Sequence, residues 1–172
     1  MSSKLESNNL YYINVSHDLI SEYLDMMNSK DINKFLSFKD RLFTLEDESK
    51  WIDQRLLNND IIFSIIEKNT NKFVGNISVM SSYDKEAEIG IVIKEGMQNK
   101  HYGSESIRWF INYLINVLKF EDIILSVYSH NLKAIHCYES LGFVEYKRDI
   151  DVGSYNGKSC DDIYMRLDRK WN

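Results

Sequence analysis

Residues 87–118 read AEIGIVIKEGMQNKHYGSESIRWFINYLINVL, which is an apolar run, a polar loop and a second apolar run with a different spacing. In the first run Ile89, Ile91 and Ile93 fall on one side of an alternating pattern, which indicates a β-strand. In the second run the apolar residues recur at the spacing of an amphipathic helix: Ile107, Phe110, Ile111, Leu114, Val117 and Leu118. A strand that leads through a polar loop into a helix predicts an α/β fold.

The chain on both sides of this segment carries further strand and helix signals. Strands are predicted at residues 10–15, 61–66, 72–81, 86–93, 122–128, 143–151 and 159–167. Helices are predicted at residues 17–27, after Asp31, after a capping box at residues 44–47, and at residues 132–140. Asn156-Gly157 is the preferred pair for the tight turn of a final hairpin. These signals predict a single domain over residues 1–172, with its core at about 10–168 and a mostly antiparallel sheet.

The composition is that of a globular chain and excludes several classes of protein. Of 172 residues, 44% are hydrophobic and 27% charged, and the net charge of -5 makes a basic nucleic-acid-binding face unexpected. Residues 1–9 lack the apolar centre of a secretion signal, and the apolar runs are too short to span a bilayer. Cys137 and Cys160 have no metal-ligand spacing. We expect a cytoplasmic protein with no metal, nucleic acid or membrane partner, and a homodimer stays open.

The polar loop at residues 98–104 is a candidate anion site. The first turn of a helix offers unpaired backbone N–H groups and the positive end of the helix dipole, which can hold a phosphate or pyrophosphate. Gly103 would let the backbone come close to such a ligand. An ordinary strand-to-helix loop has the same pattern, so the loop by itself leaves both interpretations open.

A second segment, residues 131–143, reads NLKAIHCYESLGF and adds a specific signal. With the strand at 87–93 and the loop residues Gln98, Tyr102 and Gly103, it resembles the GNAT superfamily of N-acetyltransferases, whose cofactor loop reads Gln/Arg-x-x-Gly-x-Gly/Ala. The resemblance covers residues 10–167 and looks closest to the branch of ribosomal-protein alanine and spermidine N-acetyltransferases. It implies a GNAT-like α/β (α+β) fold with a central mixed, mostly antiparallel twisted sheet of about seven strands flanked by helices. It also implies acetyl-coenzyme A as co-substrate, a small-molecule or peptide amine as acceptor, and no metal.

The resemblance assigns the cofactor-binding residues by position. The backbone of Ile91, Val92 and Ile93 would pair with the pantetheine arm. The pyrophosphate would be held by the loop Gln98, Asn99, Lys100, His101, Tyr102, Gly103 and Ser104. Asn131 would donate or accept a hydrogen bond with the cofactor.

Two residues are candidates for the chemistry itself, and a third, Cys137, lies beside one of them. Tyr138 matches the family's general acid, and a phenol with a pKa near 10 can protonate a departing thiolate of pKa about 8.5, or hold it by a hydrogen bond. Glu88 is the candidate base that accepts the proton of the acceptor amine; alternatively it faces solvent or anchors the substrate. Cys137 lies beside Tyr138, but no activating base accompanies it, which favours simple packing over a nucleophilic role.

His101 departs from the family pattern, because it stands where the loop has its first glycine. Its Cβ narrows the allowed φ, although an imidazolium there could instead pair with a phosphate. A rival interpretation is a catalytically silent coenzyme A-binding regulatory module in which His101 marks an altered loop. A P-loop nucleotide-binding protein is set aside, because the chain has no Gly-x-x-x-x-Gly-Lys-Ser/Thr. The acceptor stays open among a polyamine, an amino sugar, an aminoglycoside and a protein N-terminus.

Overall fold

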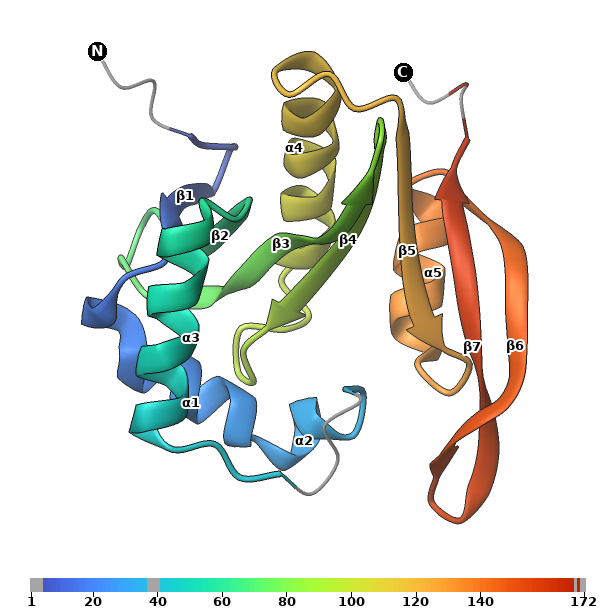
Figure 1. Ribbon diagram of the computed structural model, residues 1–172, viewed down its shortest axis with the longest axis horizontal. Helices are drawn as coiled ribbons and strands as arrows, with labels where there is room; N and C mark the ends of the chain where they lie inside the picture. Colours follow the sequence, from blue (N-terminus) through green and yellow to red (C-terminus); the bar gives the residue numbers. More distant parts are fainter. Residues whose placement is uncertain (1–4, 37–40, 169, 171–172) are drawn as a thin grey trace. The chain divides into compact units, whose positions relative to one another are not determined.

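The computed structural model describes residues 5–36, 41–168 and 170. Figure 1 labels the elements along the chain. They are β1 (Leu10–Asn14), the short 3-10 helix η1 (His17–Leu19), α1 (Ile20–Asn28), α2 (Lys30–Asn33), α3 (Leu45–Asn58), β2 (Ile62–Glu67), β3 (Phe73–Tyr83), β4 (Glu86–Ile93), α4 (Tyr102–Asn116), β5 (Asp122–Tyr128), α5 (Leu132–Ser140), β6 (Phe143–Tyr155) and β7 (Lys158–Leu167).

The strands form one sheet of seven in the order β1-β2-β3-β4-β5-β7-β6. The pairs β1–β2, β2–β3, β5–β7 and β6–β7 are antiparallel. The pair β4–β5 is parallel, because α4 carries the chain back to the same edge between these two strands. The predicted mixed α/β fold with a mostly antiparallel, seven-stranded sheet is therefore confirmed.

The chain divides into two compact units, and each is described by itself. Unit 1 contains residues 1–79 and 91–109, and unit 2 contains residues 80–90 and 110–172. The strands β3 and β4 and the helix α4 each contribute residues to both units. The expectation of a single domain stays a prediction.

In unit 1 the strand β2 is buried on both faces, as its unbroken apolar sequence predicts. On one face Ile62 and Ile66 join a core cluster with Tyr23 of α1 and Ile52 of α3. Tyr23 shares a hydrogen bond of 2.8 Å with the hydroxyl of Ser64, which satisfies both buried polar groups.

The other face of unit 1 packs against the first half of α4. The Trp109 ring of α4 stacks on Tyr12 of β1 at 3.6 Å between centroids and meets Phe63 of β2 edge-on. Burial raises the pKa of Tyr12 to about 12, so its hydroxyl stays protonated. These aromatic contacts fix the first turns of α4 against β1 and β2.

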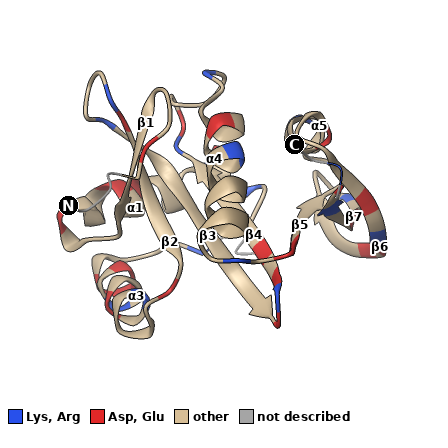
Figure 2. Ribbon diagram, turned by 90° about the horizontal axis from the view of Figure 1, so that it is seen from above, with Lys and Arg blue, Asp and Glu red and all other residues tan. Residues whose placement is uncertain are grey.

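Unit 2 buries one face of β5 and β7. The register places Leu125 opposite Met165 and Val127 opposite Ile163, and all four side chains are buried. The helix α5 lies along these strands in Figure 1. On β6 and β7 charges of both signs are interspersed, as Figure 2 shows, and several of them form ion pairs within the hairpin.

The predicted helix and turn signals hold with one correction. Thr44 and Asp47 form the predicted capping box at the start of α3, with bonds of 2.9 and 3.2 Å. Asn156 and Gly157 both have positive φ, as a primed turn requires. The predicted helix at 17–27 is instead the 3-10 turn η1 followed by α1, because Ser16 caps Asp18 in a tight first turn.

Candidate active site

The predicted pantetheine strand, Ile91 to Ile93, ends β4 within unit 1. Gly75 of β3 lies so close to it that an ideal Cβ on residue 75 would sit 2.0 Å from the carbonyl oxygen of Val92. The Lys94 N–H donates to the Val74 carbonyl at 2.8 Å, which holds the two chains together just beyond this point. The absence of a side chain at Gly75 therefore allows the Val92 carbonyl to lie this close to β3. The sequence carried a signal for it that we did not use, since a glycine inside a strand pattern marks a close backbone approach.

The predicted pyrophosphate loop is a tight turn anchored at both ends. At its start the Gln98 amide donates to the Ile93 carbonyl at 3.1 Å, which ties the loop to the end of β4. At its end Ser104 Oγ and the Glu105 N–H both donate to the His101 carbonyl, at 2.9 and 3.0 Å. Since α4 begins at Tyr102, the N–H groups of residues 102–104 precede the first bond of the helix.

Two residues of this loop have left-handed backbone conformations. Asn99 has φ 63° and His101 has φ 62°. Asparagine and histidine enter this region more readily than most residues, but each carries a steric cost there that glycine does not. The His101 side chain is exposed.

Gly103 lies in the first turn of α4 in ordinary surroundings. A Cβ at this position would meet only Ile93 Cγ1, at 3.7 Å, which is a normal van der Waals contact. No neighbouring protein atom requires a glycine here. The missing side chain leaves room beside the helix N-terminus for a ligand to approach the backbone.

Tyr102 connects the loop to the turn between β2 and β3. Its hydroxyl donates a hydrogen bond to the Glu67 carboxylate, and the Thr70 hydroxyl donates a second. The bond with Glu67 raises the pKa of Tyr102. The hydrogen bonds from Thr70 and then Tyr102 lower the pKa of Glu67, so at neutral pH the acceptor is a carboxylate. Sequence reasoning missed Glu67, because residues 35 positions apart show no shared pattern.

Asn131 and Tyr138 belong to α5 and its N-cap, Glu88 belongs to β4, and all three residues lie in unit 2. Asn131 is the N-cap of α5, and its side-chain oxygen accepts from the Ala134 N–H at 3.3 Å. A hydrogen bond to a cofactor would therefore come from its amide nitrogen. Glu88 on β4 accepts from Ser81 Oγ at 2.8 Å.

Tyr138 is partly buried on α5, where its ring meets Phe143 edge-on at 6.1 Å. Burial raises its pKa, so the phenol stays protonated at neutral pH and can donate a hydrogen bond. Burial also raises the pKa of the neighbouring Cys137 thiol. A raised thiol pKa disfavours the thiolate that a nucleophile needs, which agrees with a packing role for Cys137.

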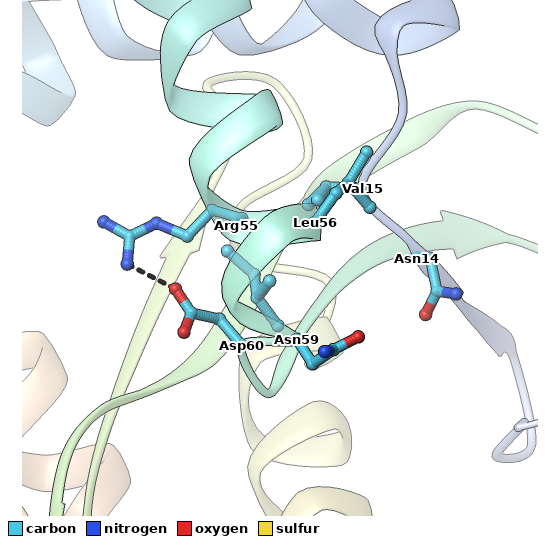
Figure 3. Close-up of a pocket in the computed structure, with 7 residues that line it drawn as sticks. Asn14, Val15, Arg55, Leu56, Asn59 and Asp60 are labelled. Atoms are coloured by element: carbon cyan, nitrogen blue, oxygen red, sulfur yellow. Dashed lines mark hydrogen bonds and ion pairs between the residues drawn. The ribbon is translucent and has the colours of Figure 1, made fainter.

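Figure 3 shows a pocket of about 200 Å³ in unit 1 that contains none of the predicted site residues. It is lined by Asn14, Val15, Arg55, Leu56, Asn59, Asp60 and Ile62. Arg55 and Asp60 form an ion pair of 2.7 Å, so the two charged groups of the pocket neutralise each other.

Two features are absent from the part of the chain that the structure describes, residues 5–36, 41–168 and 170. Within these residues, no group of three or more His, Cys, Asp or Glu side chains could hold a metal ion. Within the same residues, no helix has the length and apolar character to cross a membrane.

Comparison with known proteins gives the decisive observation, since residues 10–144 match the acetyltransferase (GNAT) domain. The chain belongs to the GNAT acetyltransferase family. The resemblance stated from the sequence is thereby confirmed. In the GNAT loop pattern a glycine occupies the place of His101, and the φ of 62° at this residue is the conformation that glycine adopts without strain.

Two curated relatives match part of the chain. An uncharacterized protein of Methanocaldococcus jannaschii is 29% identical over 118 residues, which are 68% of this chain and 24% of that protein. The spermidine N(1)-acetyltransferase of Vibrio cholerae is 27% identical over 99 residues, which are 56% of this chain and 57% of that enzyme. The matches thus span about a quarter and somewhat more than half of the relatives' lengths.

Among solved structures, the spermidine N-acetyltransferase of Vibrio cholerae in complex with CoA and spermine superimposes with a TM-score of 0.83. It shares 20% sequence identity, and the match covers 94% of this chain and 96% of that one. This likeness confirms the GNAT fold.

Proposed function

We propose that this GNAT protein is an N-acetyltransferase that moves the acetyl group of acetyl-coenzyme A directly onto a primary amine. The observation that carries the proposal is the loop at residues 98–104. Its first residue, Gln98, is bonded to the end of β4. The loop then turns through two left-handed residues and opens a helix whose first N–H groups precede the first helical hydrogen bond.

In unit 1, the loop at residues 98–104 and the end of β4 would hold coenzyme A. The N–H groups of residues 102–104 would bind the pyrophosphate, and Gly103 leaves space for it to approach. The backbone of Ile91 to Ile93 would pair with the pantetheine arm as an added strand does. In unit 2, the Asn131 amide nitrogen would donate to the cofactor.

The reaction is one direct substitution. The amine nitrogen attacks the acetyl carbonyl carbon, a C–N bond forms and the C–S bond breaks. Glu88 accepts the proton that the amine must lose, directly or through water. Tyr138 donates its phenolic hydrogen bond to the departing sulfur. The free thiol has a pKa of about 8.5 and burial raises the pKa of Tyr138, so the hydrogen bond contributes more than complete proton transfer.

The acceptor is a primary amine of a polyamine, an amino sugar or a protein N-terminus. Spermidine is the first of these to test, because a relative at 27% identity bears the name of a spermidine acetyltransferase.

The test is an acceptor screen with acetyl-coenzyme A, in which released thiol is measured together with the mass of each amine. We expect at least one amine to gain an acetyl group in step with thiol release. Binding of coenzyme A without transfer to any amine would favour the silent module instead. No binding of coenzyme A would refute both.

A further inference from the structure

Glu67, the last residue of β2, accepts a hydrogen bond from Tyr102, the first residue of α4, although the proposed reaction needs no carboxylate at this place. Glu67 is 9% exposed, and its carboxylate accepts hydrogen bonds from Tyr102 and Thr70. The turn from Glu67 to Lys72 is itself closed by two backbone bonds of 2.9 Å, Glu67 N–H to Lys72 and Asn71 N–H to Glu67. The carboxylate is therefore held on a rigid turn.

A carboxylate near the proposed pyrophosphate site would repel the ligand, so its presence there needs a compensating benefit. The local positive charges offset part of this repulsion, since Lys72 and Lys100 both act electrostatically on Glu67. The Lys100 ammonium also lies 6.0 Å from the centre of the Tyr102 ring. Because the bond between Tyr102 and Glu67 joins a phenol to a carboxylate, it is stronger than a bond between two neutral groups.

The loop at residues 98–102 needs a bond of this kind to hold its conformation. Asn99 and His101 both occupy the left-handed region, and strained residues persist only where their surroundings hold them. The side-chain bond of Gln98 to Ile93 holds the start of the loop. The bond of Tyr102 to Glu67 holds its end, at the residue whose N–H is the first of the proposed pyrophosphate donors.

We propose that Glu67 is a positioning residue for the cofactor loop: through Tyr102 it holds the strained turn at residues 98–102 in the conformation that binds pyrophosphate. The inference rests on the proposed function. Glu67 does not touch the cofactor; its effect is to keep the loop in its bound conformation before the cofactor arrives, which lowers the cost of binding.

The test compares Glu67→Ala, Glu67→Gln and Tyr102→Phe with the wild-type protein. We expect Glu67→Ala and Tyr102→Phe each to weaken coenzyme A binding about tenfold in calorimetric titration, the lower end for a charge-assisted hydrogen bond. The double variant should bind no more weakly than either single variant, because both remove the same bond. Glu67→Gln keeps an acceptor and should lose less. The acetyl-coenzyme A KM should rise while kcat at saturating cofactor stays within about twofold.

A second measurement needs no cofactor. The Glu105 amide closes the first helical turn by its bond to His101, so its hydrogen exchange in the free protein reports on the loop. We expect roughly tenfold faster exchange at Glu105 in Tyr102→Phe, a change of one oxygen atom, with unchanged exchange at Ile111 and Leu114. The matched controls are Tyr83→Phe and Glu46→Ala. Tyr83 is 87% exposed, and Glu46 forms an exposed ion pair with Lys50. Neither should change binding or exchange.

The possible outcomes distinguish the proposed function from the positioning role of Glu67. A wild-type protein that does not bind coenzyme A would refute the proposed function and this inference with it. Wild-type binding with unchanged affinity in Glu67→Ala and Tyr102→Phe would refute the inference alone. Additive losses in the double variant, or faster exchange throughout α4, would show a general structural role and would also overturn it.

Discussion

Replacing Gly75 with alanine adds one methyl group where the protein has no room for it. The new Cβ would lie 2.0 Å from the Val92 carbonyl oxygen and 3.0 Å from Ile93 Cα. Real contacts of this kind are essentially never shorter than 3.0 Å, so β3 and β4 must separate locally by about 1 Å. The neighbours are backbone atoms that cannot rotate away, which places the cost at the upper end of the usual 1–3 kcal/mol for overpacking, about 3 kcal/mol. For a chain of this length, that corresponds to a fall of roughly 6–12 °C in Tm.

Thermal unfolding of the free protein measures this cost, and calorimetric titration with coenzyme A measures its effect on the site. We expect weaker binding in Gly75→Ala as well, because the displaced residues Val92 and Ile93 are those proposed to meet the pantetheine arm. The matched control is Gly103→Ala, where the added methyl makes a normal contact of 3.7 Å with Ile93 Cγ1. This variant should keep or slightly raise Tm, since alanine favours helix. It controls for the steric cost alone, because its methyl group enters the space proposed for the pyrophosphate and should weaken coenzyme A binding. A Gly75→Ala protein that melts within about 2 °C of wild type would refute the steric argument.

Three further changes test other parts of the molecule. Tyr138→Phe should lower kcat roughly 10²-fold or more with little change in cofactor affinity, because the ring remains; near-normal turnover with chemistry rate-limiting would remove Tyr138 from the mechanism. His101→Gly should remove the backbone strain of a histidine in the left-handed region. Thermal unfolding should show a free energy of unfolding higher by about 1 kcal/mol. Coenzyme A titrations of this variant and the wild type at pH 6 and pH 8 reveal any phosphate contact as weaker binding by the variant at pH 6. Glu48 is 4% exposed, and burial, followed by the charge of Asp47, raises its pKa above the ordinary 4.5. The folded protein then binds more protons than the unfolded one above pH 4.5, so this group costs stability as the pH rises through its folded pKa. Glu48→Gln should therefore raise stability at pH 7 by roughly 1 kcal/mol and have little effect below pH 4.5, and an equal gain at both pH values would contradict the linkage.

Local patterns predicted much of the fold. The unbroken apolar run at residues 61–66 predicted a strand covered on both faces, and β2 is buried at every position. Thr44 and Asp47 predicted a capping box that the structure contains. These predictions succeed because a helix cap, a strand face or a tight turn depends on residues a few positions apart. The start of the first helix was harder to predict, since the choice between a 3-10 turn and an α-helical turn at Ser16 depends on small energy differences.

The sequence by itself determined the strand-loop-helix at residues 87–118, the second motif at residues 131–143 and, through them, the GNAT family. Only the tertiary structure decided that Gly75 must be glycine, that His101 is left-handed, and that Glu67 holds Tyr102. The physical reason is the range of the interactions. Periodicity and capping depend on residues close together in the chain, so they can be recognised in the sequence. The approach of Gly75 to Val92 and the bond from Tyr102 to Glu67 instead join residues that meet only when the strands and α4 have packed.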